Sequence, residues 1–172
     1  MKIKRYKEIK EYITDNNISQ EETQKIMIER PSEIILMHDK NNETTGSLNL
    51  WHNRPDFNGK KTSYIGNVNI FEKYRKDEEN IFNEMFESLK KEGIETIIGP
   101  LNGTTWNTYR YVTEKGNGRR FLLEPWNEDY YVSLFEEIGF KHLARYISTV
   151  MEGMNSEGRK NLNKKMERLK KF

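Results

Sequence analysis

The sequence predicts an α+β fold in which a mixed, mostly antiparallel sheet carries helices on its faces. Three observations lead to this class. Short apolar runs with a period of two residues alternate along the chain with segments of helical spacing. The length of 172 residues is that of one domain. Aromatic residues make up 12% of a chain that is 33% charged, so large rings must supply much of the core.

The first half of the chain is expected to hold two helices and three strands. Residues 8–16 and 19–30 have helical patterns, and Ser19 can cap the second helix, with Glu22 completing a capping box. Turn-forming residues at 41–46 indicate a hairpin between the first two strands. The expected strands lie at residues 33–39, 47–52 and 63–71.

The second half begins with the clearest helix, which Asp77 can cap and Gly93 can end. Its apolar face repeats at Ile81, Phe82, Met85, Phe86 and Leu89. Residues 94–100 and 121–126 are expected to be extended, and residues 140–151 form the last predicted strand. Between them Asn127 is expected to cap a helix whose inward side chains are Tyr131, Leu134, Phe135 and Ile138.

Composition excludes several classes of function. The chain has no cysteine and only three scattered histidines, so we expect no metal site. Its N-terminus lacks the apolar region of a signal peptide, and no run is long and apolar enough to span a membrane. We therefore expect a cytoplasmic protein.

Charge is unevenly distributed along the chain. Residues 159–172 carry seven Lys or Arg and one Glu, and residues 1–10 are also basic. A basic end can bind nucleic acid, but apolar residues at near-helical spacing within 159–172 favour an amphipathic helix with a solvated basic face. We expect one domain over residues 1–151, with N-terminal helices at 1–32 and the core at 33–151. Residues 152–172 are expected to be a basic tail or helix.

From residue 33 to about residue 151 the order of elements resembles the GNAT superfamily of acyl-CoA-dependent N-acyltransferases. Two stretches carry the resemblance: "EKYRKDEEN" between a strand and a helix, and "LFEEIGF", where a helix runs into a strand. The stretches "GPLNGTTW" and "LEPWNEDYY" resemble a divergent bacterial branch of that superfamily. The resemblance implies a GNAT-like fold and an acyl-CoA, acetyl-CoA in the first instance, as co-substrate.

The resemblance also implies where the acyl-CoA would bind. The strand backbone at 67–70 would hold the thioester, and phosphates bind well at the start of a helix, where free N–H groups and the helix dipole favour negative charge. The cofactor-binding residues expected on this basis are Asn69, Ile70, Tyr74, Arg75 and Lys76.

Two catalytic residues are expected. In the family a tyrosine commonly protonates the departing thiolate, and Phe135 stands at its position here. Tyr131, one turn earlier on the same helix face, can replace it, although a core tyrosine is the alternative. Glu124 can act as the general base if burial raises its pKa, and a solvent-facing or salt-bridged Glu124 is the alternative.

Acceptor-binding residues are expected where the strand at 94–100 ends, because ligands of open sheets gather at the carboxyl ends of strands. In the alternative interpretation, Thr104 or Thr105 caps a short helix whose Trp106 and Tyr109 pack inward. The expected acceptor-binding set is Asn102, Thr104, Trp106, Asn107, Tyr109, Arg110, Trp126, Asn127 and Tyr130.

Two functions remain open from the sequence. The first is transfer of an acyl group, in the first instance acetyl, to a small amine. The alternative is a GNAT-like module that has lost this chemistry and binds a small polar ligand or a protein partner. It is supported by Phe135 and by Glu78 and Asn80, which replace the glycines of the family's phosphate loop. Nucleic acid ranks last as a partner, and a homodimer is one alternative for the assembly.

Overall fold

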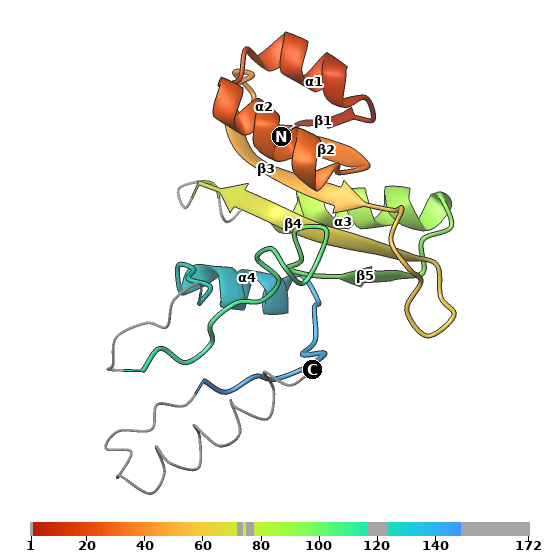
Figure 1. Ribbon diagram of the computed structural model, residues 1–172. Coiled ribbons are helices and arrows are strands. Elements are labelled where there is room, and N and C mark those ends of the chain that lie inside the picture. Colours follow the sequence, from red (N-terminus) through yellow and green to blue (C-terminus); the bar gives the residue numbers. More distant parts are fainter. Residues whose placement is uncertain (1, 72–73, 75–77, 117–123, 149–172) are drawn as a thin grey trace, which may run out of the picture. The chain divides into compact units, whose positions relative to one another are not determined.

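The computed structural model describes residues 2–71, 74, 78–116 and 124–148. Its centre is one five-stranded sheet in the order β1-β2-β3-β4-β5 (Figure 1). The first four strands are antiparallel neighbours, and β5 is parallel to β4. The strands are β1 Lys2–Tyr6, β2 Glu33–His38, β3 Thr44–Trp51, β4 Thr62–Ile70 and β5 Thr96–Ile98. The expected α+β class with a mixed, mostly antiparallel sheet is confirmed.

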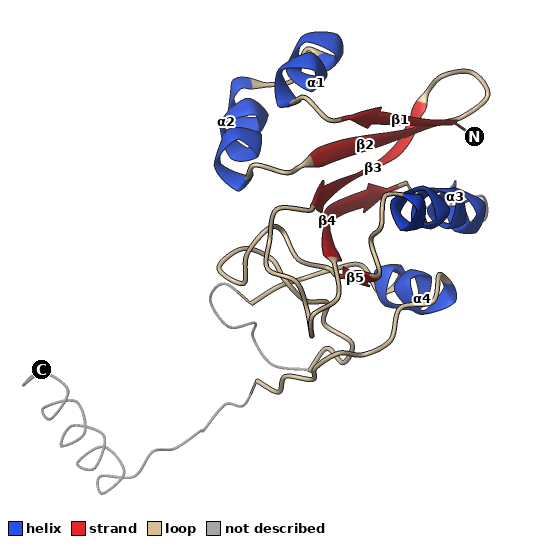
Figure 2. Cartoon of the chain, turned by 90° about the vertical axis from the view of Figure 1, so that its right-hand side faces the viewer, coloured by secondary structure: helices blue, strands red, loops and turns tan. Residues whose placement is uncertain are grey.

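Two pairs of helices cover the two faces of this sheet (Figure 2). The pair α1 and α2 lies on one face, and the pair α3 and α4 lies on the other. Their bounds are α1 Ile9–Asn16, α2 Gln20–Glu29, α3 Glu78–Lys91 and α4 Tyr130–Glu137.

Each face of the sheet has its own apolar cluster. The cluster on the α3 and α4 side includes Ile35, Leu48, Ile65 and Phe82, all fully buried, together with the inward residues of α4. The smaller cluster on the α1 and α2 side is built around Tyr6, Tyr12, Ile26, Ile34 and Leu36. Strand β2 serves both clusters, which is why it reads as a continuous apolar run rather than an alternating one.

Strand β1 was not predicted, because no strand was expected before residue 8. It pairs with β2 from Lys2↔His38 to Tyr6↔Ile34. It is an edge strand, and lysines on an edge strand keep other chains from pairing with it. Those lysines also hide the alternation that would have identified the strand.

Helix ends agree with expectation at one place and differ at another. The Ser19 hydroxyl accepts a hydrogen bond from the Glu22 N–H at 3.1 Å, which confirms the predicted cap of α2. Asn127 does not cap α4, because the N-cap residue is Asp129. The Asn127 side chain instead accepts a hydrogen bond from the Val112 N–H at 2.7 Å, so it ties the preceding loop to the start of α4.

Residues 1–140 form one compact unit, and residues 141–172 are assigned to a second. The predicted last strand at 140–151 is wrong over residues 141–148, which form no strand. An alternating pattern makes a strand only where a neighbour supplies hydrogen bonds. Leu143, Tyr146 and Ile147 are exposed. Residues 149–151 and the predicted tail lie outside the described residues.

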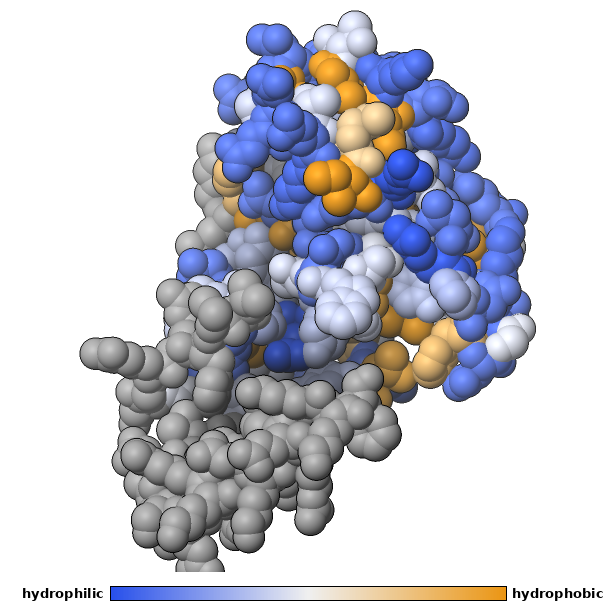
Figure 3. Space-filling model, viewed as in Figure 1, coloured by the Kyte–Doolittle hydropathy of each residue, from blue (hydrophilic) through white to orange (hydrophobic). Residues whose placement is uncertain are grey.

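The surface over the helices in Figure 3 is mostly hydrophilic, with small separate apolar patches. No helix in the described part of the chain is long and apolar enough to cross a membrane.

Candidate functional site

Strand β4 is paired on both sides only over its first residues. Its parallel ladder with β5 covers three pairs, from Thr62↔Thr96 to Tyr64↔Ile98. Beyond them the Leu101 N–H donates to the Ile65 carbonyl at 2.8 Å, and the chain then leaves the sheet. The two strands therefore separate, beginning at the middle of β4.

A β-bulge marks this point on the other edge of β4. The pairs Asn49↔Gly66 and Ser47↔Asn69 leave two residues of β4 opposite one residue of β3. One of the two, Asn67, has a φ of 46°, which is left-handed backbone. Bulges of this kind turn a side chain out of the regular alternation, and here that side chain is Asn67.

Asn102 takes the place of a neighbouring strand at the bulge. Its Oδ1 accepts a hydrogen bond from the Asn67 N–H at 2.7 Å, and its Nδ2 donates to the Asn67 Oδ1 at 2.5 Å. Gly66 allows this close approach, since a Cβ there would lie 2.5 Å from the Leu101 carbonyl oxygen. The loop after β5 is thus anchored to β4 by one amide pair.

The Asn67 amide also reaches helix α2. Its Nδ2 donates to a carboxylate oxygen of Glu29, the last residue of α2, at 2.5 Å. Glu29 is 8% exposed, and its carbonyl accepts a hydrogen bond from the Trp51 indole at 2.9 Å. The end of α2 is therefore fixed to both β3 and β4.

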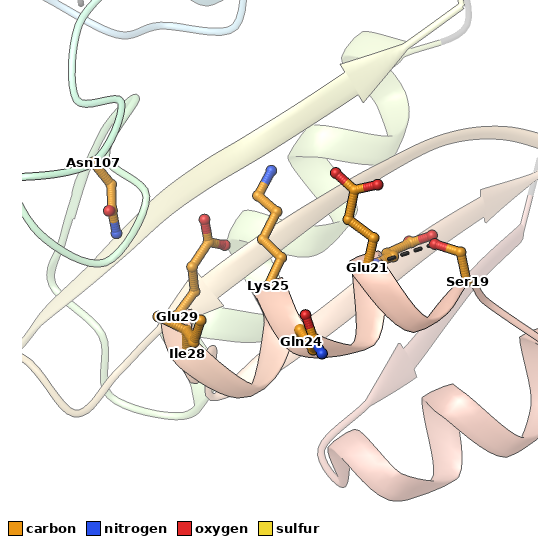
Figure 4. A pocket seen from close by; sticks show the side chains of 8 residues that line it. Ser19, Glu21, Gln24, Lys25, Ile28, Glu29 and Asn107 are labelled. Carbon is orange, nitrogen blue, oxygen red and sulfur yellow. Dashed lines mark hydrogen bonds between the residues drawn. The ribbon is translucent and has the colours of Figure 1, made fainter.

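An open groove lies between α2 and the loop that carries Asn107, with a volume of about 570 Å³. Figure 4 shows the side chains of Glu21, Lys25 and Glu29 rising from α2 on the same side, while Asn107 reaches back from the opposite loop. Asn107 is itself held, because its amide donates to the Asn102 carbonyl at 2.8 Å. The groove is lined by Ser19, Glu21, Glu22, Gln24, Lys25, Ile28, Glu29 and Asn107.

Two tyrosines from α4 reach the last residue of β4. The Ile70 N–H donates to the Tyr131 hydroxyl at 3.2 Å, and the Tyr130 hydroxyl donates to the Ile70 carbonyl at 2.7 Å. Since the Phe71 N–H donates to Thr45 on β3, the Ile70 groups point away from β3. Side chains thus satisfy the open edge of β4 here, as Asn102 does at the bulge.

Aromatic rings fill the space behind these hydroxyls. Tyr131 stacks between Tyr130 and Tyr111, with ring centroids 4.3 and 5.5 Å away. Tyr111 also meets the edge of Phe135. Burial raises the Tyr111 pKa above its ordinary value, with smaller contributions from the neighbouring tyrosines Tyr131 and Tyr130. Tyr111 is therefore a neutral packing residue at any physiological pH.

The backbone of Ile70 provides a test of whether an acyl-CoA fits. One N–H and one C=O face the open edge of β4, and hydroxyl groups rather than a strand satisfy them. The amide and thioester groups of an acyl-CoA form hydrogen bonds with such a donor and acceptor. The Ile70 groups therefore fit an acyl-CoA once the hydroxyls of Tyr130 and Tyr131 move off them. Arg75 and Lys76, expected at the phosphates, lie outside the described residues.

The expected acceptor-binding residues are only partly brought together. Asn102 and Asn107 lie at the bulge and the groove, whereas Asn127 is buried and structural. The alternative short helix with an inward Trp106 is wrong, since no helix forms at 101–110 and Trp106 is 95% exposed. Thr104 accepts a hydrogen bond from the Trp106 N–H.

The other expected residues lie around α4 and on β4. Arg110 donates to the hydroxyl of Tyr109 and lies over its ring. The Trp126 ring packs under Lys115, whose ammonium is 4.3 Å from the ring centroid. Glu124 and Tyr74 are partly buried, and Asn69 is exposed on β4.

Glu29 and the side chain of Asn67 were missed as site residues, although the backbone at 67–70 was expected to hold the thioester. Asn67 was within a predicted strand, and no local pattern shows a bulge. Glu29 did carry a signal: it lies three residues after Ile26, and both are buried on one face of α2. A carboxylate at an inward position of an amphipathic helix is unusual enough to be noticed.

Among the described residues, no group of three or more His, Asp or Glu side chains could hold a metal ion.

No protein-family model matches the sequence, and comparison with curated proteins also gives no match. Solved structures do match. A tetramutant of the BH1408 protein of Bacillus halodurans is 12% identical with a TM-score of 0.50, over 88% of this chain and 100% of that one. Several acetyltransferases also match, at TM-scores below 0.5.

Two of these acetyltransferases are named for a class of compound. Glucosamine-6-phosphate N-acetyltransferase from Arabidopsis thaliana is 10% identical with a TM-score of 0.45, over 88% of this chain and 100% of that one. An aminoglycoside acetyltransferase from an uncultured soil metagenomic sample, in complex with sisomicin, is 11% identical with a TM-score of 0.48. The match covers 87% of this chain and 96% of that one. At these identities the likeness concerns the fold.

Proposed function

We propose that this chain is a GNAT-fold N-acyltransferase that acylates a small amine. The observation that carries the proposal is the open half of β4. One end of this edge adjoins the α2 groove through Asn67 and Glu29, and at the other end Ile70 presents an N–H and a C=O. An acyl-CoA would supply the activated acyl group, and acetyl is the first choice.

Tyr131 is the proposed proton donor. Its hydroxyl accepts the hydrogen bond from the Ile70 N–H, so its own proton is not used in that bond. A hydroxyl held at the sheet edge can give this proton to a departing group. Glu124, partly buried before α4, keeps its proposed role as the base that removes a proton from the amine.

Acetyl transfer to a panel of small amines, followed by mass spectrometry, tests the proposal. Tyr131→Phe should lower kcat about a hundredfold while the KM for acetyl-CoA does not rise, because the lost proton acts only in the transition state. Tyr64→Phe is the matched control: Tyr64 lies at the paired end of β4, and its hydroxyl donates to the Pro55 carbonyl. No product, together with no calorimetric binding of acetyl-CoA at millimolar concentration, would overturn the proposal.

A binding module without acyl transfer is the second candidate, and the same two hydroxyls favour it. With Tyr130 and Tyr131 on Ile70, the backbone groups that would hold a thioester are already satisfied. The double variant Tyr130→Phe/Tyr131→Phe distinguishes the candidates. If the double variant binds acetyl-CoA more tightly than the wild type, the two hydroxyls compete with acetyl-CoA for Ile70, and the acyltransferase is favoured. If neither protein binds acetyl-CoA, the binding module is favoured.

A further inference from the structure

Glu29 is a buried carboxylate without a cationic partner among the described residues. It is 8% exposed, and the Asn67 amide is the only described donor that forms a hydrogen bond with its side chain. Arg54 reaches the Glu29 carbonyl at 3.5 Å, not the carboxylate. A buried charge of this kind is costly unless a partner of opposite charge compensates it. A cation bound from outside the described chain would supply such a partner.

The side chain faces a space where such a charge can arrive. Glu29 lines the α2 groove, whose volume of about 570 Å³ is within the range of small-molecule sites. Glu21 and Glu22 lie in the same lining, and Lys25 is its only basic residue among those described. The lining thus has a negative balance, and Figure 4 shows Lys25 directed upward between Glu21 and Glu29.

The groove also has a part suited to hydrocarbon. Ile28 lines it while remaining 80% exposed, which is high for a large apolar side chain. A ligand with a cationic end and a short alkyl chain would cover Ile28 and bring its charge to Glu29. An inorganic cation would find too few oxygen ligands, since no described group of three or more acidic or histidine side chains lies together.

The amide pair at the bulge fixes the direction of the carboxylate. Asn102 holds Asn67 through two hydrogen bonds, and Asn67 holds one oxygen of Glu29. That oxygen is therefore used, and the other has no hydrogen-bond partner among the described residues. Asn67 and Asn102 are positioning residues in this arrangement.

We propose that the α2 groove binds a protonated primary alkylamine and that Glu29 is its counter-charge. The inference rests on the proposed function, because it assigns the class of amine that the acceptor side takes. The ammonium donates to the second oxygen of Glu29, and the alkyl chain lies along Ile28.

Binding without any acyl donor tests this site. The full chain is titrated with 1,5-diaminopentane by calorimetry, and with 1,5-pentanediol as an uncharged ligand of the same length. The diamine should bind at least tenfold more tightly than the diol. Glu29→Gln should reduce diamine affinity at least tenfold, because glutamine can still accept from Asn67 but carries no charge. Glu43→Gln, on an exposed turn, is the matched control and should not change the affinity.

The folded state of the Glu29→Gln variant is checked by NMR. The Trp51 indole N–H donates to the backbone carbonyl of residue 29, so its resonance should stay in place in the free variant. In the wild type, the diamine should shift the side-chain amide resonances of Asn67. Lys25→Met should strengthen diamine binding, since it removes a like charge from the groove.

Several results would overturn the inference: no diamine binding, equal binding of diamine and diol, or unchanged affinity in a folded Glu29→Gln variant. These outcomes are separate from the fate of the proposed function. Diamine binding through Glu29 without any acetylated product would support this site and contradict the proposed acyltransferase. A chain that acetylates amines with unchanged kinetics in Glu29→Gln keeps the acyltransferase and loses this site.

Discussion

Two glutamates four positions apart are both buried, yet their surroundings differ. Glu33, at the start of β2, accepts two hydrogen bonds from the Arg5 guanidinium, at 2.7 and 2.9 Å. Lys7 and His52 also lie within 4 Å of it. Glu29, at the end of α2, has one amide partner. Cationic side chains surround the Glu33 carboxylate, whereas an amide orients the Glu29 carboxylate beside a groove.

Glu33 has a structural role, whereas Glu29 has a proposed role in ligand binding. Arg5 links three elements, because it also reaches Ser88 on α3 and Glu92 just after it. Glu33 is therefore part of the contact between β1, β2 and the end of α3. Among the described residues, the Glu29 carboxylate forms a hydrogen bond only with Asn67. Removal of each charge should thus affect different properties.

The largest expected effect is on stability. Glu33→Gln should lower the free energy of unfolding by about 3–5 kcal/mol, because Arg5 is left partly buried without its main counter-charge. Glu29→Gln should change it by less than about 1 kcal/mol, since the hydrogen bond from Asn67 is kept. Urea unfolding of the two variants measures both. Equal losses would mean that the two carboxylates have the same role, and the comparison would fail.

The pH dependence of stability should follow Glu33. Burial alone would raise its pKa, but the nearby His52 imidazole and the hydrogen bonds and charge of Arg5 outweigh burial and lower the pKa to about 2. The lowered value means that Glu33 stabilises the fold above its ordinary pKa of about 4.5 and stops doing so as the pH falls toward 2. This loss should be about 3 kcal/mol.

Urea unfolding at several pH values between 5 and 2 measures that loss, and Glu33→Gln should flatten the profile over this interval. A profile of the same slope in the variant would assign the acid sensitivity to other carboxylates.

A smaller effect is expected at the amide pair that orients Glu29. Asn102→Ala should cost about 1–3 kcal/mol, because the Asn67 N–H and side-chain carbonyl lose their partner in a partly buried place. It should also weaken diamine binding, by less than Glu29→Gln does. Asn107→Ala, at an exposed position of the same loop, should change stability by a few tenths of a kcal/mol. A stable Asn102→Ala protein would show that the pair is dispensable.

Much of the fold could be predicted from local patterns. The strands β2, β3 and β4 and the inward face of α4 follow from the spacing of their apolar residues, and the start of α2 follows from Ser19. Residues 141–148 show the limit of this method. Their alternation is that of a strand, but strand formation depends on a neighbour, and no local pattern supplies one.

The candidate site was less predictable because distant residues build it. Glu29 and Asn67 are 38 positions apart, and Asn102 follows 35 positions later. The stretch at 101–110 was rightly expected to follow the strand at 94–100. Its most prominent residue, Trp106, faces solvent, while Asn102, which looked like a ligand-binding group, is an anchor. Residue type predicted where the loop lies better than which side chains serve a ligand.

The bulge at Asn67 has a consequence for the phase of the whole strand. Ile65 and Ile70 are five positions apart, an odd offset, yet both belong to the apolar cluster on the α3 and α4 side. In a regular strand they would point to opposite faces. The extra residue shifts the alternation of side chains between the two faces of the sheet by one position. Every later side chain of β4 therefore points to the face opposite to the one it would have in a regular strand. Deletion of one residue between Gly66 and Asn69 would therefore turn Ile70 toward the α1 and α2 side of the sheet and Asn69 toward the apolar cluster on the α3 and α4 side.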